Sequence, residues 1–313
     1  MLRIWRDDYL TKEEIRKAFL EVRTAFPFPG YMDDKLNKYV LIISEIARVP
    51  KGSEILSIGC GPCDLEAILS KLGYNVTGVD DLSDHWHLIG KNRERIIEFC
   101  KKMGVKLIVQ PFETVQLNEN YFDAVLLIDV LEHLHRSPRE LLNKSISSLK
   151  VGGLLLIETP NAAALAKRLK ALFGKSSHVD VDFFYWNIGE YRSHIREYTR
   201  PELKQIISYH KLASSHFKMT NIGIENIETH GFLSRLTVNA YKLISGLYPN
   251  FRATILVSAR KPEEWKPTDA SIEDFKMVYP HLTKYNIDNE RDNVLINKIQ
   301  KPTSRYKRVN KIE

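Results

Sequence analysis

The chain predicts an α/β fold in which helices cover both faces of a doubly wound, mostly parallel sheet. From residue 54 onward, short apolar runs alternate with segments of helical periodicity, which is typical of repeated strand–helix–strand units. The first apolar run ends in a glycine turn that opens directly into a helix. A length of 313 residues is enough for one large domain with additions.

The segment that precedes the first strand, residues 1–50, predicts helices. Thr11-Lys-Glu-Glu14 is a capping box, and apolar residues follow it at helical spacing. Pro27 and Gly30 end this helix, and a second helical pattern runs over 36–48. Such a segment either covers a ligand pocket or only packs on the sheet, and both interpretations stay open.

The alternating region sets the order of the sheet elements. The predicted strands are 54–58, 75–80, 105–109, 122–128 and 154–158, and the predicted helices are 64–72, 86–103 and 137–149. Ligands of such sheets bind outside the carboxyl ends of the strands. Several residues that could bind a ligand or take part in catalysis follow these strand ends.

The glycine turn itself indicates the ligand. Gly59 and Gly61 allow a sharp bend and close approach to a ligand, and Asp80, at the end of the second strand, can accept hydrogen bonds from a ribose. A dinucleotide turn would have a third glycine where this chain has Asp64, and a carboxylate there would repel a pyrophosphate. S-adenosylmethionine carries a sulfonium and no phosphate, so the residues favour it over NAD.

Cys60-Gly-Pro-Cys63 within the same turn also matches the redox motif of thioredoxins. Gly59 stands where thioredoxins have tryptophan, and the chain is far longer than that domain. A catalytic dithiol is therefore the less favoured interpretation, and small residues that fit a tight turn are the favoured one.

The regular alternation stops between residues 161 and 199. A basic helical pattern over 162–173 is followed by an aromatic run that ends at Tyr185 and Trp186. Long insertions are usually lids or binding loops. We expect an acceptor-binding cap with Tyr185 and Trp186 as pocket walls, or alternatively a small satellite core.

After the insertion, a helix is predicted over 200–210, a strand over 217–220, a helix over 232–247 and a final buried strand over 253–259. The hydrophobic pattern thins beyond Pro262. The predicted organisation is thus a helical cover over 1–50, a main domain over 51–262 with the insertion 161–199, and a basic, flexible extension over 263–313.

The distribution of charge along the chain indicates which classes of binding partner to expect. Of the net charge of +7, residues 291–313 contribute seven basic against two acidic side chains, 7 − 2 = +5, so the body is nearly neutral. The charge therefore does not favour a nucleic-acid partner, although the basic tail could touch an anionic surface. Three cysteines and an acidic start without a secretory signal predict a cytoplasmic protein, and the oligomeric state is not readable.

Several ordered motifs resemble class I S-adenosylmethionine-dependent methyltransferases over residues 40–260. They are Ile58-Gly-Cys-Gly-Pro62, Gly78-Val-Asp80, Phe122-Asp-Ala-Val125, Asp129-Val-Leu-Glu-His133, Lys150-Val-Gly-Gly-Leu-Leu155 and Glu158-Thr-Pro-Asn161. The resemblance implies a Rossmann-like seven-stranded sheet of order 3-2-1-4-5-7-6 with an antiparallel last strand.

The resemblance also implies roles for single residues. Gly59, Cys60 and Gly61 would hold the methionine part of the donor, Asp80 and Asp81 would lie at the ribose, and Asp129 near the amino group. Phe112 stands where many relatives have an acid after the third strand, so adenine would be held by stacking beside Phe112 and Glu113.

The segment 191–203 is similar to one in ubiquinone-type and glycan-pathway O-methyltransferases, which implies a hydroxyl acceptor. A hydroxyl loses its proton during attack, and His133 or His194 could take it, with Glu132 or Asp129 orienting the imidazole. The sequence also resembles a carboxylate–histidine site for a divalent metal, with the ligands Asp129, Glu132, His133 and His194. A bound metal is the less favoured interpretation. RNA or protein methylation and a non-catalytic binding module remain alternatives.

Overall fold

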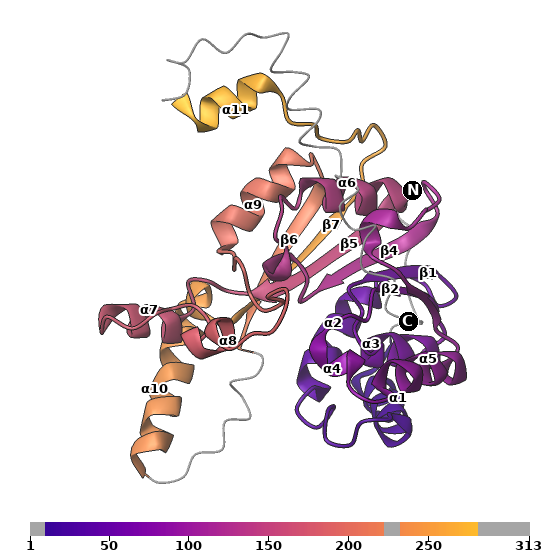
Figure 1. Ribbon diagram of the computed structural model, residues 1–313, viewed down its shortest axis with the longest axis horizontal. Coiled ribbons are helices and arrows are strands. Elements are labelled where there is room, and N and C mark those ends of the chain that lie inside the picture. Colours follow the sequence, from indigo (N-terminus) through magenta and orange to yellow (C-terminus); the bar gives the residue numbers. More distant parts are fainter. Residues whose placement is uncertain (1–9, 222–231, 281–313) are drawn as a thin grey trace. The chain divides into compact units, whose positions relative to one another are not determined.

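The computed structural model describes residues 10–221 and 232–280, and the helices and strands named below lie in these ranges (Figure 1). The chain divides into two compact units, one up to Pro267 and one from Thr268. The second unit contains α11 (Ile272–Val278). Most of the predicted basic extension, residues 281–313, lies outside the described residues.

The first unit is built on one seven-stranded sheet of order β3-β2-β1-β4-β5-β7-β6. The strands are β1 (Glu54–Ile58), β2 (Asn75–Asp80), β3 (Lys106–Val109), β4 (Phe122–Ile128), β5 (Leu149–Pro160), β6 (Ala213–Thr220) and β7 (Thr254–Arg260). All neighbouring pairs are parallel except those that involve β7, which is antiparallel to β5 and β6. The predicted fold and strand order are confirmed.

Helices cover the sheet on both faces. They are α1 (Lys12–Ala25), α2 (Leu36–Ile46), α3 (Asp64–Lys71), α4 (His85–Leu88), α5 (Asn92–Met103), α6 (Arg139–Ser148), α7 (Leu165–Leu172), α8 (Val181–Tyr185), α9 (Arg200–Tyr209) and α10 (Phe232–Leu247). The single helix predicted over 86–103 is two helices, because Gly90 adopts a positive φ of 59° between α4 and α5. Short 3-10 turns are η1 (Phe112–Thr114), η2 (Leu131–His133) and η3 (Pro249–Phe251).

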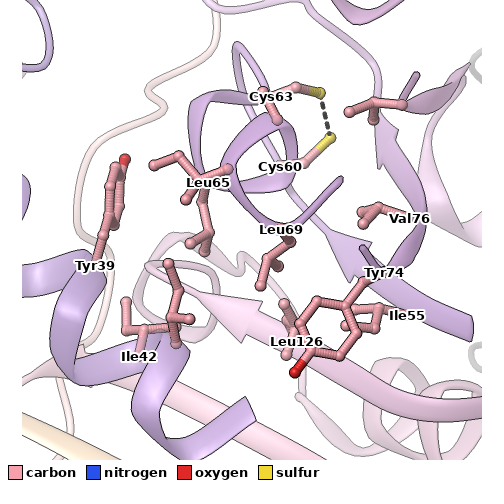
Figure 2. Close-up of a cluster of buried hydrophobic side chains, with 14 of the residues drawn as sticks. Tyr39, Ile42, Ile55, Cys60, Cys63, Leu65, Leu69, Tyr74, Val76 and Leu126 are labelled. Atoms are coloured by element: carbon pink, nitrogen blue, oxygen red, sulfur yellow. Dashed lines mark hydrogen bonds between the residues drawn. The ribbon is translucent and has the colours of Figure 1, made fainter. Parts of the chain in front are cut away.

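The alternation of side chains along the strands produces two hydrophobic cores. In β4, Ala124 and Leu126 face a core shared with α1, α2, α3 and α5, whereas Val125 and Leu127 face a core shared with α6 and α9. Figure 2 shows part of the first core, where Tyr39 and Ile42 of α2 lie opposite Leu65 of α3. The N-terminal helices therefore pack against the helix that follows the glycine turn.

Long apolar helices are not found in the described residues. None of the helices there has the length and hydropathy needed to cross a bilayer.

Candidate active site

The glycine turn between β1 and α3 opens into a cavity of about 300 Å³ at the carboxyl end of the sheet. Gly59 has φ = 66°, and a Cβ there would lie 2.8 Å from Val130 Cγ2, so a larger side chain would meet the loop after β4. Gly59, Cys60 and Gly61 line the cavity, as do Asp129 and His133 from the loop after β4. The predicted residues of the turn and of that loop are thus brought together.

The other predicted ligand contacts lie outside this cavity. Asp80 accepts hydrogen bonds from Gly61 N–H (2.8 Å) and Leu82 N–H (2.7 Å), so its carboxylate supports the turn. Asp81 pairs with Arg192 of the insertion. Phe112 and Glu113 lie in η1, where their carbonyl oxygens accept hydrogen bonds from Lys144 Nζ. Asp80, Asp81, Phe112 and Glu113 do not line the cavity, and their roles at the nucleoside stay predictions.

The N-terminal segment supplies one wall of the cavity with Tyr31, Lys35, Lys38 and Tyr39. Lys35 Nζ lies 3.0 Å from Asp64 Oδ2 and 3.5 Å from the centroid of the Tyr31 ring, and the Tyr39 hydroxyl donates to the same carboxylate oxygen. Of the described part of residues 1–50, four residues between 31 and 39 line the cavity, whereas α1 packs in the hydrophobic core; the role of the whole segment as a cover stays a prediction. These four residues were missed because a Lys or Tyr in a turn or helix gives no signal that distinguishes a pocket wall from a solvated face.

Lys38 is held between two carboxyl groups. Its ammonium pairs with Asp129 and lies 3.0 Å from Glu158 Oε2, which is buried at the end of β5. Burial raises the pKa of Glu158. Burial also acts to raise the pKa of Asp129, but the charge of Lys38 together with hydrogen bonds to Glu158 and Lys38 outweighs it, so the pKa of Asp129 is lowered. Asp129 itself has φ = 53°, a left-handed conformation that turns its side chain towards Lys38 and the cavity.

Glu66 is a buried carboxylic side chain that lines the cavity. Glu66 accepts a hydrogen bond from Ser57 Oγ (2.6 Å) and its other oxygen has no partner within the described residues. Burial raises its pKa to about 8, so it is protonated at neutral pH. His87 also lines the cavity, 2% exposed, and neither ring nitrogen has a partner in the described part of the chain. Buried polar atoms without partners in Glu66 and His87 indicate that the cavity binds a polar ligand.

The three predicted catalytic residues gather at one edge of this cavity. Nitrogen and carboxyl oxygen atoms of Glu132, His133 and His194 lie within 4.8 Å of one another, and the two imidazole rings are 5.0 Å apart in an edge-to-face arrangement. His133 lines the cavity, while Glu132 and His194 do not. The prediction that these residues meet, although 61 positions separate the two histidines, is in agreement with this geometry.

The residues that orient the two histidines differ from the predicted ones. His133 Nδ1 donates to Arg192 O (2.8 Å), and His194 Nδ1 lies 2.8 Å from Glu197 Oε1. The expectation that Glu132 or Asp129 orients the base was therefore wrong, because the insertion reaches back across the end of β4 and supplies both partners. With Nδ1 engaged in each case, Nε2 of each ring has no hydrogen-bond partner within the described residues.

The surroundings of Glu132, His133 and His194 shift the pKa values of the two histidines in opposite directions. Burial lowers the pKa of His133, whereas the hydrogen bond to Glu197 raises the pKa of His194. Glu132 is fully buried, accepts a hydrogen bond from Thr159 Oγ1 (3.0 Å), and burial raises its pKa to about 7. Its backbone oxygen also accepts from Ile195 N–H and Arg196 N–H, which fixes the insertion against η2.

The two aromatic residues expected to wall the acceptor pocket do not do so. Tyr185 and Trp186 are 71% and 73% exposed and lie outside the cavity. They contact each other at a ring distance of 4.8 Å, but their exposure also rules out a buried satellite core. Both sequence interpretations of this run were wrong, because helix α8 is short and turns these rings to solvent.

The cysteine motif is structural. Cys60 Sγ and Cys63 Sγ lie 3.4 Å apart in the buried turn, as Figure 2 shows, and both pack against Gly78 of β2. Burial raises the pKa of Cys60 to about 12, so it carries no thiolate at neutral pH. This supports the favoured interpretation of small residues in a tight turn.

The charges of the cavity fit a cationic ligand better than a pyrophosphate. Four acidic residues line it (Asp64, Glu66, Asp84 and Asp129) against two lysines, and with Glu66 protonated an excess of one negative charge remains. The aromatic rings of Tyr31 and Trp86 also line the wall and can contact a cation. Fold and site together define an α/β protein with a cavity at the carboxyl end of its sheet that suits a cationic ligand.

Comparisons with known proteins agree with this class. Residues 29–209, more than half of the chain, match the methyltransferase domain family. The ubiquinone biosynthesis O-methyltransferase of Rickettsia canadensis is 24% identical over 71% of this chain and 80% of its own length. That of Caulobacter vibrioides is 33% identical over 39% of this chain, and the match spans about half (48%) of its length.

Among solved structures, phosphoethanolamine N-methyltransferase 2 of Haemonchus contortus, in complex with phosphomonomethylethanolamine and S-adenosylhomocysteine, superposes with a TM-score of 0.51 at 17% identity. The superposition covers 81% of this chain and 58% of that one, and it shows a shared fold. The chain belongs to the methyltransferase domain family, as an enzyme of class I that uses S-adenosylmethionine.

Proposed function

We propose that this methyltransferase methylates a hydroxyl group of a small molecule or glycan. The observation that carries the proposal is the position of His133 at the cavity: its Nδ1 donates to Arg192 O, and its Nε2 has no hydrogen-bond partner in the part of the chain that the structure describes. A free imidazole nitrogen at this place can take the proton that a hydroxyl loses as it attacks. The named relatives are O-methyltransferases of ubiquinone biosynthesis, which supports oxygen as the acceptor atom.

The donor, when bound, supplies a methyl group on a positively charged sulfur. The chain's residues bind and align it: the Gly59–Gly61 turn allows close approach, and Lys38 holds Asp129 at the cavity wall. In-line transfer depends chiefly on such alignment. Of the two histidines proposed as the base, His133 is the better placed, because it lines the cavity and His194 does not.

The insertion, residues 161–199, acts in this proposal as the acceptor cap through its later part rather than through Tyr185 and Trp186. Tyr191 O and Arg192 O accept hydrogen bonds from His135 Nε2 and His133 Nδ1, and Arg192 pairs with Asp81. These contacts fix the segment around 191–194 over the strand ends. An acceptor would enter beside it.

The acceptor class can be tested directly. The protein is incubated with methyl-labelled S-adenosylmethionine and with cell extract separated into lipid-linked glycans, quinones, RNA and protein. We expect label in a small-molecule or glycan fraction. Label only in RNA or protein would contradict the proposed acceptor class. If calorimetry shows no heat of donor binding, the chain would be a non-catalytic binding module.

A second candidate for the same step is a divalent cation held by Glu132, His133 and His194. The close approach of their ligand atoms and the unpartnered Glu132 Oε1 favour it. A cation there would lower the pKa of a coordinated hydroxyl in place of a base.

We also propose that the reaction takes place in the cytoplasm, since Cys60, Cys63 and Cys100 are free thiols of the kind that a reducing compartment preserves.

A further inference from the structure

Glu66 differs from the other acidic residues of the cavity in having no basic partner within the described part of the chain. The other three are each paired with a basic side chain: Asp64 with Lys35, Asp129 with Lys38, and Asp84 with Arg192. Both lysines that line the cavity are therefore already engaged. A positive partner for Glu66 is left for a ligand to supply.

The position of Glu66 directs one oxygen atom to such a ligand. The side chain is 2% exposed, belongs to the first turn of α3 and lines the cavity. Its Oε1 accepts a hydrogen bond from Ser57 Oγ (2.6 Å), whereas its Oε2 is buried without a partner among the described residues. A buried polar atom without a partner costs stability until a ligand bonds to it.

The surroundings of Glu66 disfavour its charged form. Burial raises its pKa to about 8 and the charges of Asp64 and Asp80 act in the same direction, whereas the hydrogen bond from Ser57 acts to lower it. The titratable groups that interact with its charge are Asp64, Asp80, Tyr31, Tyr39, Cys60 and Cys63. None of them carries a positive charge. A cation bound beside Glu66 would reverse this balance, because an opposite charge favours the ionised carboxylate.

We propose that Glu66 binds the ammonium group of the methionine part of S-adenosylmethionine and gives up its proton when the donor binds. The proton leaves Oε2 for the solvent, and the carboxylate that remains accepts a hydrogen bond from the ammonium group, which has three N–H donors. The Gly59–Gly61 turn, expected to hold the methionine part, lies a few residues before Glu66 in the chain. The inference rests on the donor alone and holds whichever acceptor is methylated.

Asp129 is the other candidate for this ammonium group. Its carboxylate already pairs with Lys38, and its pKa is lowered, so it is ionised at neutral pH before the donor binds. Binding to Asp129 would therefore release no proton. Proton release distinguishes the two carboxyl groups.

Isothermal titration calorimetry of the full chain counts the protons. Titrations at pH 7 in phosphate and in Tris, whose heats of ionisation differ, should show about one proton released for each S-adenosylmethionine bound. Because a reaction that releases a proton is favoured at higher pH, donor affinity should rise up to about tenfold from pH 6 to pH 7. Glu66→Gln has no proton to release, so it should abolish both the release and the rise in affinity.

Matched controls separate Glu66 from general effects. Glu45→Gln changes another buried glutamate, 5% exposed in α2 and outside the cavity, and should keep the proton release. S-adenosylhomocysteine, which has the ammonium group without the sulfonium, should release the same proton, and 5′-methylthioadenosine, which has neither, should release none. These ligand comparisons need no variant to fold.

Ser57→Ala is a milder change, which removes only the hydrogen bond to Oε1. It should keep the proton release and weaken donor binding about fivefold, because the ionised carboxylate loses one donor. The proposal is overturned by the absence of proton release in the unchanged protein, by release that persists in Glu66→Gln, or by unchanged affinity in Ser57→Ala. Release with S-adenosylmethionine but not with S-adenosylhomocysteine would also overturn it, since the sulfonium would then be the partner.

Discussion

Lys38 of the N-terminal helix α2 forms an ion pair with Asp129 at the end of β4, across 91 positions of sequence. The same ammonium lies 3.0 Å from Glu158 Oε2. One side chain from outside the alternating region thus holds together two of the carboxyl groups at the strand ends. The site is complete only when the N-terminal segment is packed in place.

Lys38→Met should weaken both folding and donor binding. Removing the ammonium leaves Glu158 buried without its cation and frees Asp129, which we expect to lower the free energy of unfolding by about 2–3 kcal/mol, discounted for the partial exposure of Asp129. Donor affinity in calorimetry should fall at least about tenfold. Lys38→Arg keeps the charge and should lose much less stability and donor affinity. Equal losses in the two variants would argue that the shape of the lysine side chain, rather than its charge, matters here.

Glu66 should make stability fall as pH rises. Its pKa is raised to about 8 in the folded protein, above the value of about 4.5 expected when unfolded, so the folded state binds the proton more tightly. Its contribution is complete below about pH 4.5 and is lost as pH rises towards 8, with a slope of at most about 1.4 kcal/mol per pH unit. Glu66→Gln should flatten this slope in urea unfolding measured from pH 5 to 8. Parallel curves for the two proteins would contradict the assignment.

His133→Ala should lower turnover roughly 10²- to 10⁴-fold, which is the usual contribution of a general base. Donor affinity should change little, because the Gly59–Gly61 turn and Lys38 are untouched. His135→Ala is the matched control, since this exposed histidine makes the same type of bond to the insertion, Nε2 to Tyr191 O at 2.8 Å, outside the cavity. If both variants lose turnover equally, the histidines act by anchoring the insertion.

Chelation distinguishes a base from a metal. If His133 acts as a base, dialysis against a chelator should leave turnover unchanged. Loss of turnover that Mg²⁺ or Mn²⁺ restores would assign Glu132, His133 and His194 to a metal site instead. Glu132→Gln provides an independent readout, because metal bound to the purified protein would fall with it in elemental analysis.

The local pattern of residues was sufficient for the sheet and the turn. Short apolar runs that form buried strands, glycines where the backbone needs a positive φ, and an alternating order of strands and helices are all properties of neighbouring residues. They predicted the strands, the helices between them and the glycine turn, whereas the strand order was implied by the resemblance to class I methyltransferases. Helix boundaries were less accurate, as the division at Gly90 between α4 and α5 shows.

Contacts between distant residues were decided only by the tertiary structure. Lys35 and Lys38 reach the cavity because α2 packs against α1 and β5, and His133 is oriented by Arg192 because the insertion folds back over the end of β4. Tyr185 and Trp186 ended in solvent, although aromatic residues usually gain from burial. Periodicity reports which face of an element is apolar. It does not report which remote segment packs against that face, since that choice depends on the free energy of the whole arrangement.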